Sequence, residues 1–295
     1  TGASNTAVGL NALNLSTTAS NNTAVGMHAL YANTTGTENV AVGMASLDNC
    51  DVGSENTAIG KSALGNDTKG SRNTAVGNSA LQTQNFTSAT NAYNSAFGFN
   101  AGGAVTTGLR NTLIGAKAGD TITTGGDNVA VGANALTANT TASSNTAVGS
   151  SALLANTTGT RNTAVGANAL DASTTANYNS AFGTHAGSSI TTGSLNSVFG
   201  DYALAATTTG DGNSAFGQAS LGQNTTGHSN TAVGKVSLYS NTQGLRNTAL
   251  GFNAGGSVTN GDDNVMVGIY AGNHAVGTTT GNQNTLIGAQ TRADS

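Results

Sequence analysis

One short phrase recurs along the chain, and its spacing constrains the fold more than any other feature. A periodic series of seventeen Asn-x-x-x-Gly patterns runs from Asn5 to Asn284 in the 295 residues. Fourteen of the sixteen steps between successive occurrences are 17 residues long. The step from Asn73 to Asn94 is 21 residues, and the step from Asn264 to Asn284 is 20. A strict period of this length is typical of a solenoid, in which each repeat forms one coil that packs on its neighbours.

The content of each coil indicates strands and turns. When the Asn is numbered position 1, position 5 is Gly in all seventeen coils, and position 4 is always Val, Ile, Leu or Phe. Position 3 is Ala in thirteen coils. A short run rich in β-branched residues and closed by Gly predicts a short strand followed by a turn. Because 17 residues with this pattern leave no room for a helix and two turns, we expect an all-β parallel β-solenoid (a β-roll or β-helix) of seventeen 17-residue coils.

Alternation along each strand places positions 3 and 4 on opposite faces. Both positions are apolar, whereas a strand with one face in water has a polar residue at every second site. We therefore expect position 3 to line the narrow interior of the coil, where Ala fits. We expect position 4 to face another surface.

Positions 9 and 12 vary together. Position 9 is Leu in eleven coils, usually with a small or polar residue at position 12, and it is Gly in five coils. Four of those five coils have a branched aliphatic residue at position 12: Val105, Ile122, Ile190 and Val258. Because an unfilled space of Leu size in a core costs about 2–5 kcal/mol, we expect the two positions to share one interior pocket.

The invariant Asn and Gly residues have structural interpretations. Gly at position 5 permits a positive φ or a close approach of the chain at a corner. An Asn that recurs once per coil can stack at ~4.8 Å and form a hydrogen-bonded ladder along the axis. We predict this ladder for Asn22, Asn39, Asn56, Asn145 and Asn162, together with Gly26, Gly43, Gly60, Gly149 and Gly166.

Composition excludes several classes of partner. Only 7% of the residues are charged and the formal net charge is −4, so we expect no nucleic acid partner. No apolar run approaches the ~20 residues that span a bilayer, so we expect no membrane insertion. The single cysteine, Cys50, rules out a disulfide framework within the chain and is interpreted as a small residue in a turn.

Residues suited to chemistry are scattered. The four histidines fall on different coils, which does not suit a metal site, and no phosphate-binding or dinucleotide-binding motif occurs. A glycan hydrolase would need two converging carboxylates, and the candidates are Glu38, Asp48, Asp51, Glu55, Asp67, Asp262 and Asp263. Because no aromatic residues are placed to wall a cleft, we favour a solvated corner or a weak cation site. We expect no enzyme activity, no catalytic residue, no metal and no cofactor.

The repeat also predicts self-association. Each coil buries only a few small apolar side chains, which is little against the conformational entropy of ordering 17 residues. Burial of the outer strand face against other copies would add stabilising free energy. We therefore expect a homo-oligomer, with a trimer about a common axis as the simplest closed rod. Residues 1–295 are interpreted as a single repeat solenoid with insertions at 82–93 and 273–280. Because the pattern begins and stops without a polar cap, we expect a fragment of a longer fibre.

The repeated text resembles a known family. "NTAVGxxAL…TTG", as in Asn22–Gly36 and Asn162–Leu170, resembles the head repeats of trimeric autotransporter adhesins. It is closer still to the NTAVG repeats of phage and virus tail-fibre proteins that end in an intramolecular endosialidase-type chaperone. The resemblance covers Asn5 to about Ala289 and implies a left-handed parallel β-roll in a homotrimer. The 17-residue coil is longer than the usual adhesin-head repeat, and no coiled-coil stalk, membrane anchor or chaperone domain falls within these residues.

The function that follows is a structural or adhesive extracellular fibre. We expect a viral (phage) tail-fibre or bacterial surface-adhesin shaft that acts as a rigid spacer and multivalent binder of a host or surface, with cell-surface glycan as a possible partner. The candidate receptor contacts are Phe86 and Tyr93 in the first insertion and His274 in the second. Three alternatives stay open: an ice-binding solenoid, a self-assembling extracellular filament, and the fibre-borne glycan hydrolase. Ice binding would use Thr columns, but pairs such as Thr34 and Thr35 are adjacent, so alternation directs only one of them outward.

Overall fold

The chain folds as strands and turns. The computed structural model describes residues 2–273 and 280–291, in which no helix occurs, and so none that could cross a membrane. The chain divides into two compact units, Thr1–Asn145 and Thr146–Ser295. Each unit is a parallel β-solenoid with one three-residue strand per coil, which confirms the all-β parallel solenoid predicted from the period.

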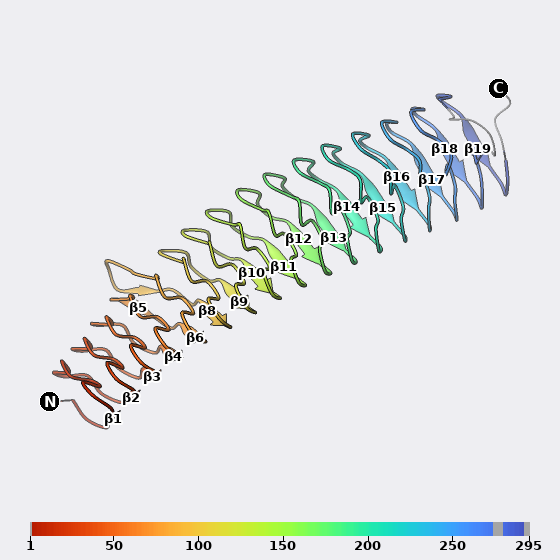
Figure 1. Cartoon of the computed structure of the whole chain (residues 1–295). Helices are drawn as coiled ribbons and strands as arrows, with labels where there is room; N and C mark the ends of the chain where they lie inside the picture. Colours follow the sequence, from red (N-terminus) through yellow and green to blue (C-terminus); the bar gives the residue numbers. More distant parts are fainter. Residues whose placement is uncertain (1, 274–279, 292–295) are drawn as a thin grey trace. The chain divides into compact units, whose positions relative to one another are not determined.

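In the first unit, eight strands pair in parallel in chain order. They are β1 (Thr6–Val8), β2 (Thr23–Val25), β3 (Val40–Val42), β4 (Thr57–Ile59), β6 (Thr74–Val76), β8 (Ser95–Phe97), β9 (Thr112–Ile114) and β10 (Val129–Val131). The two-residue strands β5 (Gly70–Ser71) and β7 (Thr90–Asn91) form a separate parallel pair. The 21-residue coil between β6 and β8 protrudes beyond its neighbours (Figure 1).

In the second unit, nine strands pair in parallel, again in chain order (Figure 1). They are β11 (Thr146–Val148), β12 (Thr163–Val165), β13 (Ser180–Phe182), β14 (Ser197–Phe199), β15 (Ser214–Phe216), β16 (Thr231–Val233), β17 (Thr248–Leu250), β18 (Val265–Val267) and β19 (Thr285–Ile287). No insertion interrupts the coils from β11 to β18.

The strands stack in register, so each position of the repeat forms a column. Ala164 of β12 lies opposite Ala181 of β13, and Val165 lies opposite Phe182. Both alanines are fully buried, whereas Val165 and Phe182 are partly exposed. Position 3 therefore lines the interior, as predicted, and position 4 points out of the coil.

Backbone hydrogen bonds between coils continue through the turns. The N–H of Leu30, at position 9, donates to the carbonyl of Ser46 in the following coil at 3.0 Å. The N–H of Glu38, at position 17, donates to the carbonyl of Ser20 in the preceding coil at 3.1 Å. The turns thus have the same axial ladder as the strands, which satisfies most of their buried polar groups.

The Asn side chains complete this ladder at position 1. The backbone N–H of Asn230 donates to Oδ1 of Asn213 at 3.0 Å, and Nδ2 of Asn230 donates to the carbonyl of Gly244 at 2.8 Å. Asn39 likewise donates from its backbone to Oδ1 of Asn22. Each amide therefore serves a backbone N–H on one side and a backbone carbonyl within its own coil. Such contacts involve all five asparagines of the predicted ladder, Asn22, Asn39, Asn56, Asn145 and Asn162.

Gly at position 5 is required by both conformation and space. Gly26 and Gly43 have φ values of 132° and 129°, in the region that favours glycine. A Cβ on Gly26 would also lie 2.7 Å from the carbonyl of Gly43 in the next coil. The other glycines of the predicted set, Gly60, Gly149 and Gly166, have φ values of 133°, 138° and 138°.

The pocket predicted for positions 9 and 12 exists. Leu170 and Ile190, which lie in consecutive coils, are both fully buried. A Cβ added to Gly187, at position 9, would lie 2.9 Å from Cδ1 of Ile190 and 3.0 Å from Cδ2 of Leu170. The position-12 side chain thus fills the space that a Leu at position 9 would occupy.

The backbone conformation of the leucines at position 9 was not predicted from the sequence. Leucines at position 9 adopt positive φ, for example 50° at Leu30 and 51° at Leu170. This conformation costs a non-glycine residue roughly 1–2 kcal/mol, so the leucine side chain is retained there for its burial.

Candidate functional sites

The outer face of the strands is a uniform surface in each unit. In the second unit, the position-4 side chains of Phe199, Phe216, Val233 and Leu250 are between 36% and 49% exposed. The position-2 residues on the same face are Thr, Ser or Val in every coil, and neither position carries a charge anywhere in the sequence. The face is therefore apolar along its centre, uncharged throughout, and uncovered within a single chain.

Three consecutive aromatic rings break the aliphatic pattern of this face. The rings of Phe182 and Phe199 stack with centroids 4.7 Å apart, and those of Phe199 and Phe216 stack at 4.9 Å; each pair is 7° from parallel. Stacking at the strand spacing follows from one ring per coil in an in-register sheet. We call Phe182, Phe199 and Phe216 the phenylalanine block.

The first predicted insertion contains one buried and one exposed aromatic ring. Phe86, predicted as a receptor contact, is only 6% exposed, so little of its ring is accessible to a partner. Its carbonyl accepts a hydrogen bond from Oγ1 of Thr68 at 2.9 Å, and the four extra residues of this coil allow the ring to turn inward, where burial is favourable. Tyr93, in contrast, is 49% exposed. His274 and most of the insertion at 273–280 lie outside the described residues.

A chain of buried polar side chains lies beneath the insertion. Nε2 of Gln84 donates to Oδ2 of Asp67 at 2.6 Å, and Nδ2 of Asn94 donates to Oε1 of Gln84 at 2.8 Å. The N–H of Gly70 donates to Oδ1 of Asp67 at 2.9 Å. Burial raises the pKa of the Asp67 carboxyl, against these hydrogen bonds, which lower it. Gln84 therefore connects the coils on either side of the insertion through side chains.

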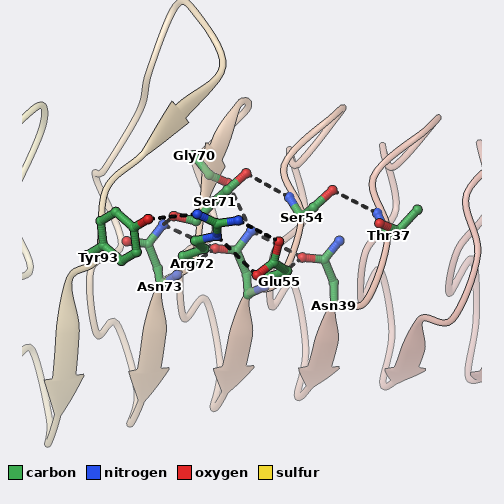
Figure 2. A network of polar contacts seen from close by, with 10 residues as sticks. Thr37, Asn39, Ser54, Glu55, Gly70, Ser71, Arg72, Asn73 and Tyr93 are labelled. Atoms are coloured by element: carbon green, nitrogen blue, oxygen red, sulfur yellow. Dashed lines mark hydrogen bonds and ion pairs between the residues drawn. The ribbon is translucent and has the colours of Figure 1, made fainter.

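Tyr93 belongs to an exposed row of side chains at position 17 (Figure 2). Arg72 donates from Nη1 to the Tyr93 hydroxyl at 2.7 Å, and its guanidinium lies 5.7 Å from the centre of the ring. On its other side, Arg72 donates to both carboxylate oxygens of Glu55 at 3.1 and 3.2 Å. We call Glu55, Arg72 and Tyr93 the tyrosine corner. A tyrosine fixed by such contacts presents a rigid, partly apolar ring to a ligand.

The second unit has the same pair of side chains without an insertion. Arg161 donates from Nη1 to the hydroxyl of Tyr178, and its guanidinium lies 5.3 Å from the centre of that ring. Tyr178 is also 49% exposed. The two corners therefore differ in the coil beneath them and in Glu55, which pairs with Arg72.

Several of the candidate carboxylates are engaged by other groups. Asp67 is buried below the insertion, whereas Glu55 pairs with Arg72 at the corner. Asp263 forms an ion pair with Arg246, and Asp51 accepts a hydrogen bond from Thr34. Among residues 2–273 and 280–291, no three His, Cys, Asp or Glu side chains form a group that could hold a metal ion. Cys50 is buried in the position-12 column, where burial raises its pKa to about 12.

A second polar ladder, at position 16, was not predicted from the sequence. The N–H of Thr37 donates to Oγ of Ser54 at 3.0 Å, and the N–H of Ser54 donates to Oγ of Ser71 at 3.0 Å (Figure 2). Asn177 and Asp211 serve as acceptors in the same way in the second unit. The signal was present as the recurrence of short polar residues at position 16, but it is weaker than the invariant Asn at position 1.

The Thr columns are only partly free. The hydroxyl of Thr157, at position 13, donates to the carbonyl of Thr174 at 3.0 Å, and those of Thr174 and Thr191 continue the series. Thr158 and Thr175, at position 14, are exposed. One column of the adjacent pair is therefore engaged within the solenoid.

Neither the protein-family models nor the curated protein sequences give a match to this chain. Its function therefore has to follow from the surfaces that its coils present.

Proposed function

We propose that the chain forms the shaft of an extracellular fibre, of the kind that viral tail fibres and bacterial surface adhesins carry. Identical copies associate through the outer strand face, and the assembly acts as a rigid spacer and multivalent binder. The observation that carries this proposal is the uncharged, apolar column at position 4, which is exposed in the single chain.

Three physical arguments support association of like copies. Parallel sheets are nearly always covered on both faces, and the interior of the coil covers only one face here. Two copies of the face meet without charge repulsion, because neither position 2 nor position 4 carries a charge. A strip of nine three-residue strands covers roughly 400 Å², so the strip of the second unit alone supplies about half of the ~800 Å² that each partner buries in a standard interface.

A trimer is the simplest closed arrangement for this face. Cyclic symmetry lets every copy use the same surface and leaves none of it open to further growth. Three faces directed at one axis enclose their position-4 columns. A filament of indefinite length would instead need a second, different surface.

The mass in solution tests the association. We expect the wild-type chain to sediment at three times its mass of 28.7 kDa. Val165→Asp places a charge on the outer face and should dissociate the assembly. Thr175→Asp places the same charge on the exposed position-14 column and should leave the assembly intact. A wild-type chain that stays monomeric at all concentrations would refute the association.

For the binding role, we propose that the tyrosine corner and the protruding coil contact a cell-surface glycan. An aromatic ring held by an arginine offers an apolar face with polar groups at its edge, and repetition in a trimer multiplies weak contacts. The test is binding to an array of cell-surface glycans. Tyr93→Ala should lose the binding, and Tyr178→Ala, which removes an equally exposed tyrosine from a regular coil, should keep it. Equal binding by both variants would remove the tyrosine corner from consideration.

A further inference from the structure

Because the outer face is regular, identical copies could associate in more than one axial register. Within each unit the strands are in register, so moving one copy by a single coil again places position 4 opposite position 4. A column of identical valines would make neighbouring registers nearly equal in energy, because register is specified only where the side-chain pattern distinguishes one alignment from another. An assembly with a defined length therefore needs a feature that does not repeat.

The phenylalanine block is such a feature. It occupies three consecutive coils, β13 to β15, and is preceded by Val148 and Val165 and followed by Val233. Its rings are larger than the valines around them, and Phe199 and Phe216 are each 37% exposed. Because the rings stack almost in parallel at 4.7 and 4.9 Å, the block is one continuous aromatic ridge.

We propose that the phenylalanine block sets the axial register between copies of this chain, by packing against the same block of each neighbouring copy. The inference rests on the association proposed above. In the aligned register, three rings of each copy meet three rings of the next. A shift of one coil leaves a ring at either end of the block opposite a valine, which loses an aromatic contact and opens a gap in the interface.

A second copy of this chain is the occupant that fits. The ridge repeats at the strand spacing, so only a surface with the same spacing can match all three rings. The flanking position-2 residues, such as Ser197 and Ser214, are small and uncharged, and they allow another ridge to approach closely.

The test uses cysteines on the outer face. Thr231→Cys and Thr248→Cys lie at position 2 of adjacent coils, and both residues are at least partly exposed. The native Cys50 is buried and should remain unreactive. Differently tagged chains that carry one or the other substitution are assembled together and oxidised. Links between identical positions report the aligned register, and links from position 231 to position 248 report a shift of one coil.

For the wild-type block, links between identical positions should exceed shifted links by about tenfold or more. Replacing all three phenylalanines with valine, the common residue at this position, should keep the fold and lower the ratio several-fold. The side chains point outward from the strand, so this replacement leaves the interior unchanged.

A second variant reverses the preference instead of removing it. Phe182→Val combined with Val233→Phe moves the block by one coil towards the C-terminus. When this variant carries Thr248→Cys and is assembled with a wild-type block carrying Thr231→Cys, the shifted link should become the favoured one. Equal yields of aligned and shifted links in the assembled wild type, or no effect of moving the block, would overturn this inference alone. A monomeric wild type would overturn it together with the proposed association.

Discussion

The Arg72–Tyr93 corner of the first unit and the Arg161–Tyr178 corner of the second unit present the same side chains on different coils. Both tyrosines are 49% exposed and both accept a hydrogen bond from the arginine one coil away. Beneath Tyr178 the regular coil supplies a backbone carbonyl, that of Ala176, to the ladder amide of Asn162. Beneath Tyr93 the chain takes a longer path, and Gln84 joins Asp67 to Asn94.

This difference shows which properties of the fold depend on the period. The exposed row of side chains at position 17 is retained across the insertion, because it needs only one residue per coil aligned with the next. The buried hydrogen bonds change in part. The N–H of Asn94 still donates to Oδ1 of Asn73 at 3.1 Å, but Nδ2 of Asn73 donates to the carbonyl of Ser71 in the preceding coil at 3.3 Å. Gln84 adds side-chain hydrogen bonds that the regular coils lack.

The largest expected effect is the loss of a ladder amide. Asn230→Ala, in a regular coil, leaves the N–H of Asn247 without its acceptor. It also takes one of two side-chain donors from the carbonyl of Gly244, which keeps Nδ2 of Asn241. An unsatisfied buried N–H costs about 1–3 kcal/mol and a lost hydrogen bond costs about 1 kcal/mol, so the expected loss of stability is about 3 kcal/mol. Asn94→Ala also removes the donor to Gln84, so it should cost more. Urea unfolding followed by circular dichroism checks both values, and a smaller effect for Asn94→Ala would contradict the role assigned to Gln84.

The shared interior pocket gives the next effect. Leu170→Gly should cost about 2 kcal/mol in total, because the cavity that it leaves costs about 2–5 kcal/mol and relief of the positive φ returns roughly 1–2 kcal/mol. Adding Ser173→Ile should restore most of that loss, because it recreates the Gly and aliphatic pattern of the coil at Gly187 and Ile190. The hydroxyl of Ser173 has no hydrogen-bond partner, so its removal carries no penalty of its own. Ser173→Ile alone should overpack the pocket and destabilise the unit; thermal unfolding that shows no rescue in the double variant would count against the pocket.

Asp67→Asn gives an effect that depends on pH. The pKa of Asp67 is raised in the folded chain, so its protonated form is favoured by folding. Wild-type stability should therefore be greatest below the pKa of about 3.9 of an unfolded Asp and should fall as pH rises towards the folded value. Asn, the common residue at position 12, has no such dependence. The variant should match the wild type near pH 3 and be the more stable of the two at pH 7; urea midpoints at both pH values check this, and a variant that is less stable at pH 7 would contradict it.

The smallest effect is expected at the corners themselves. Arg72→Gln and Arg161→Gln each remove an exposed contact, and exposed ion pairs contribute little to stability. Both variants should unfold within the scatter of the wild-type midpoint, and any loss at Arg72 should shrink in 1 M salt, because only that arginine also pairs with a carboxylate. A large loss of stability at either arginine would show that the corners contribute substantially to the stability of the coils, contrary to this prediction.

Much of the fold follows from the sequence because it repeats. The period and the interior alanines recur in most coils, and the exchange of Leu at position 9 for an aliphatic residue at position 12 recurs in several. Packing rules could therefore be checked within one sequence. The path of the insertion occurs once, and nothing in its composition shows that Phe86 turns inward or that Gln84 reaches both Asp67 and Asn94. The positive φ of the position-9 leucines could not be predicted either. Leucine rarely adopts this conformation, and burial of its side chain outweighs that preference here.

The claim that other copies cover the outer strand face is tested most directly by hydroxyl-radical footprinting of the phenylalanine block in solution. We expect Phe182, Phe199 and Phe216 to be oxidised several-fold more slowly in the wild-type chain than in the Val165→Asp variant, because burial at an interface excludes water from the rings. Tyr178, which lies at a corner, should react equally in both. Equal oxidation of the three phenylalanines in the two chains would show that the face is open to solvent and would contradict the account.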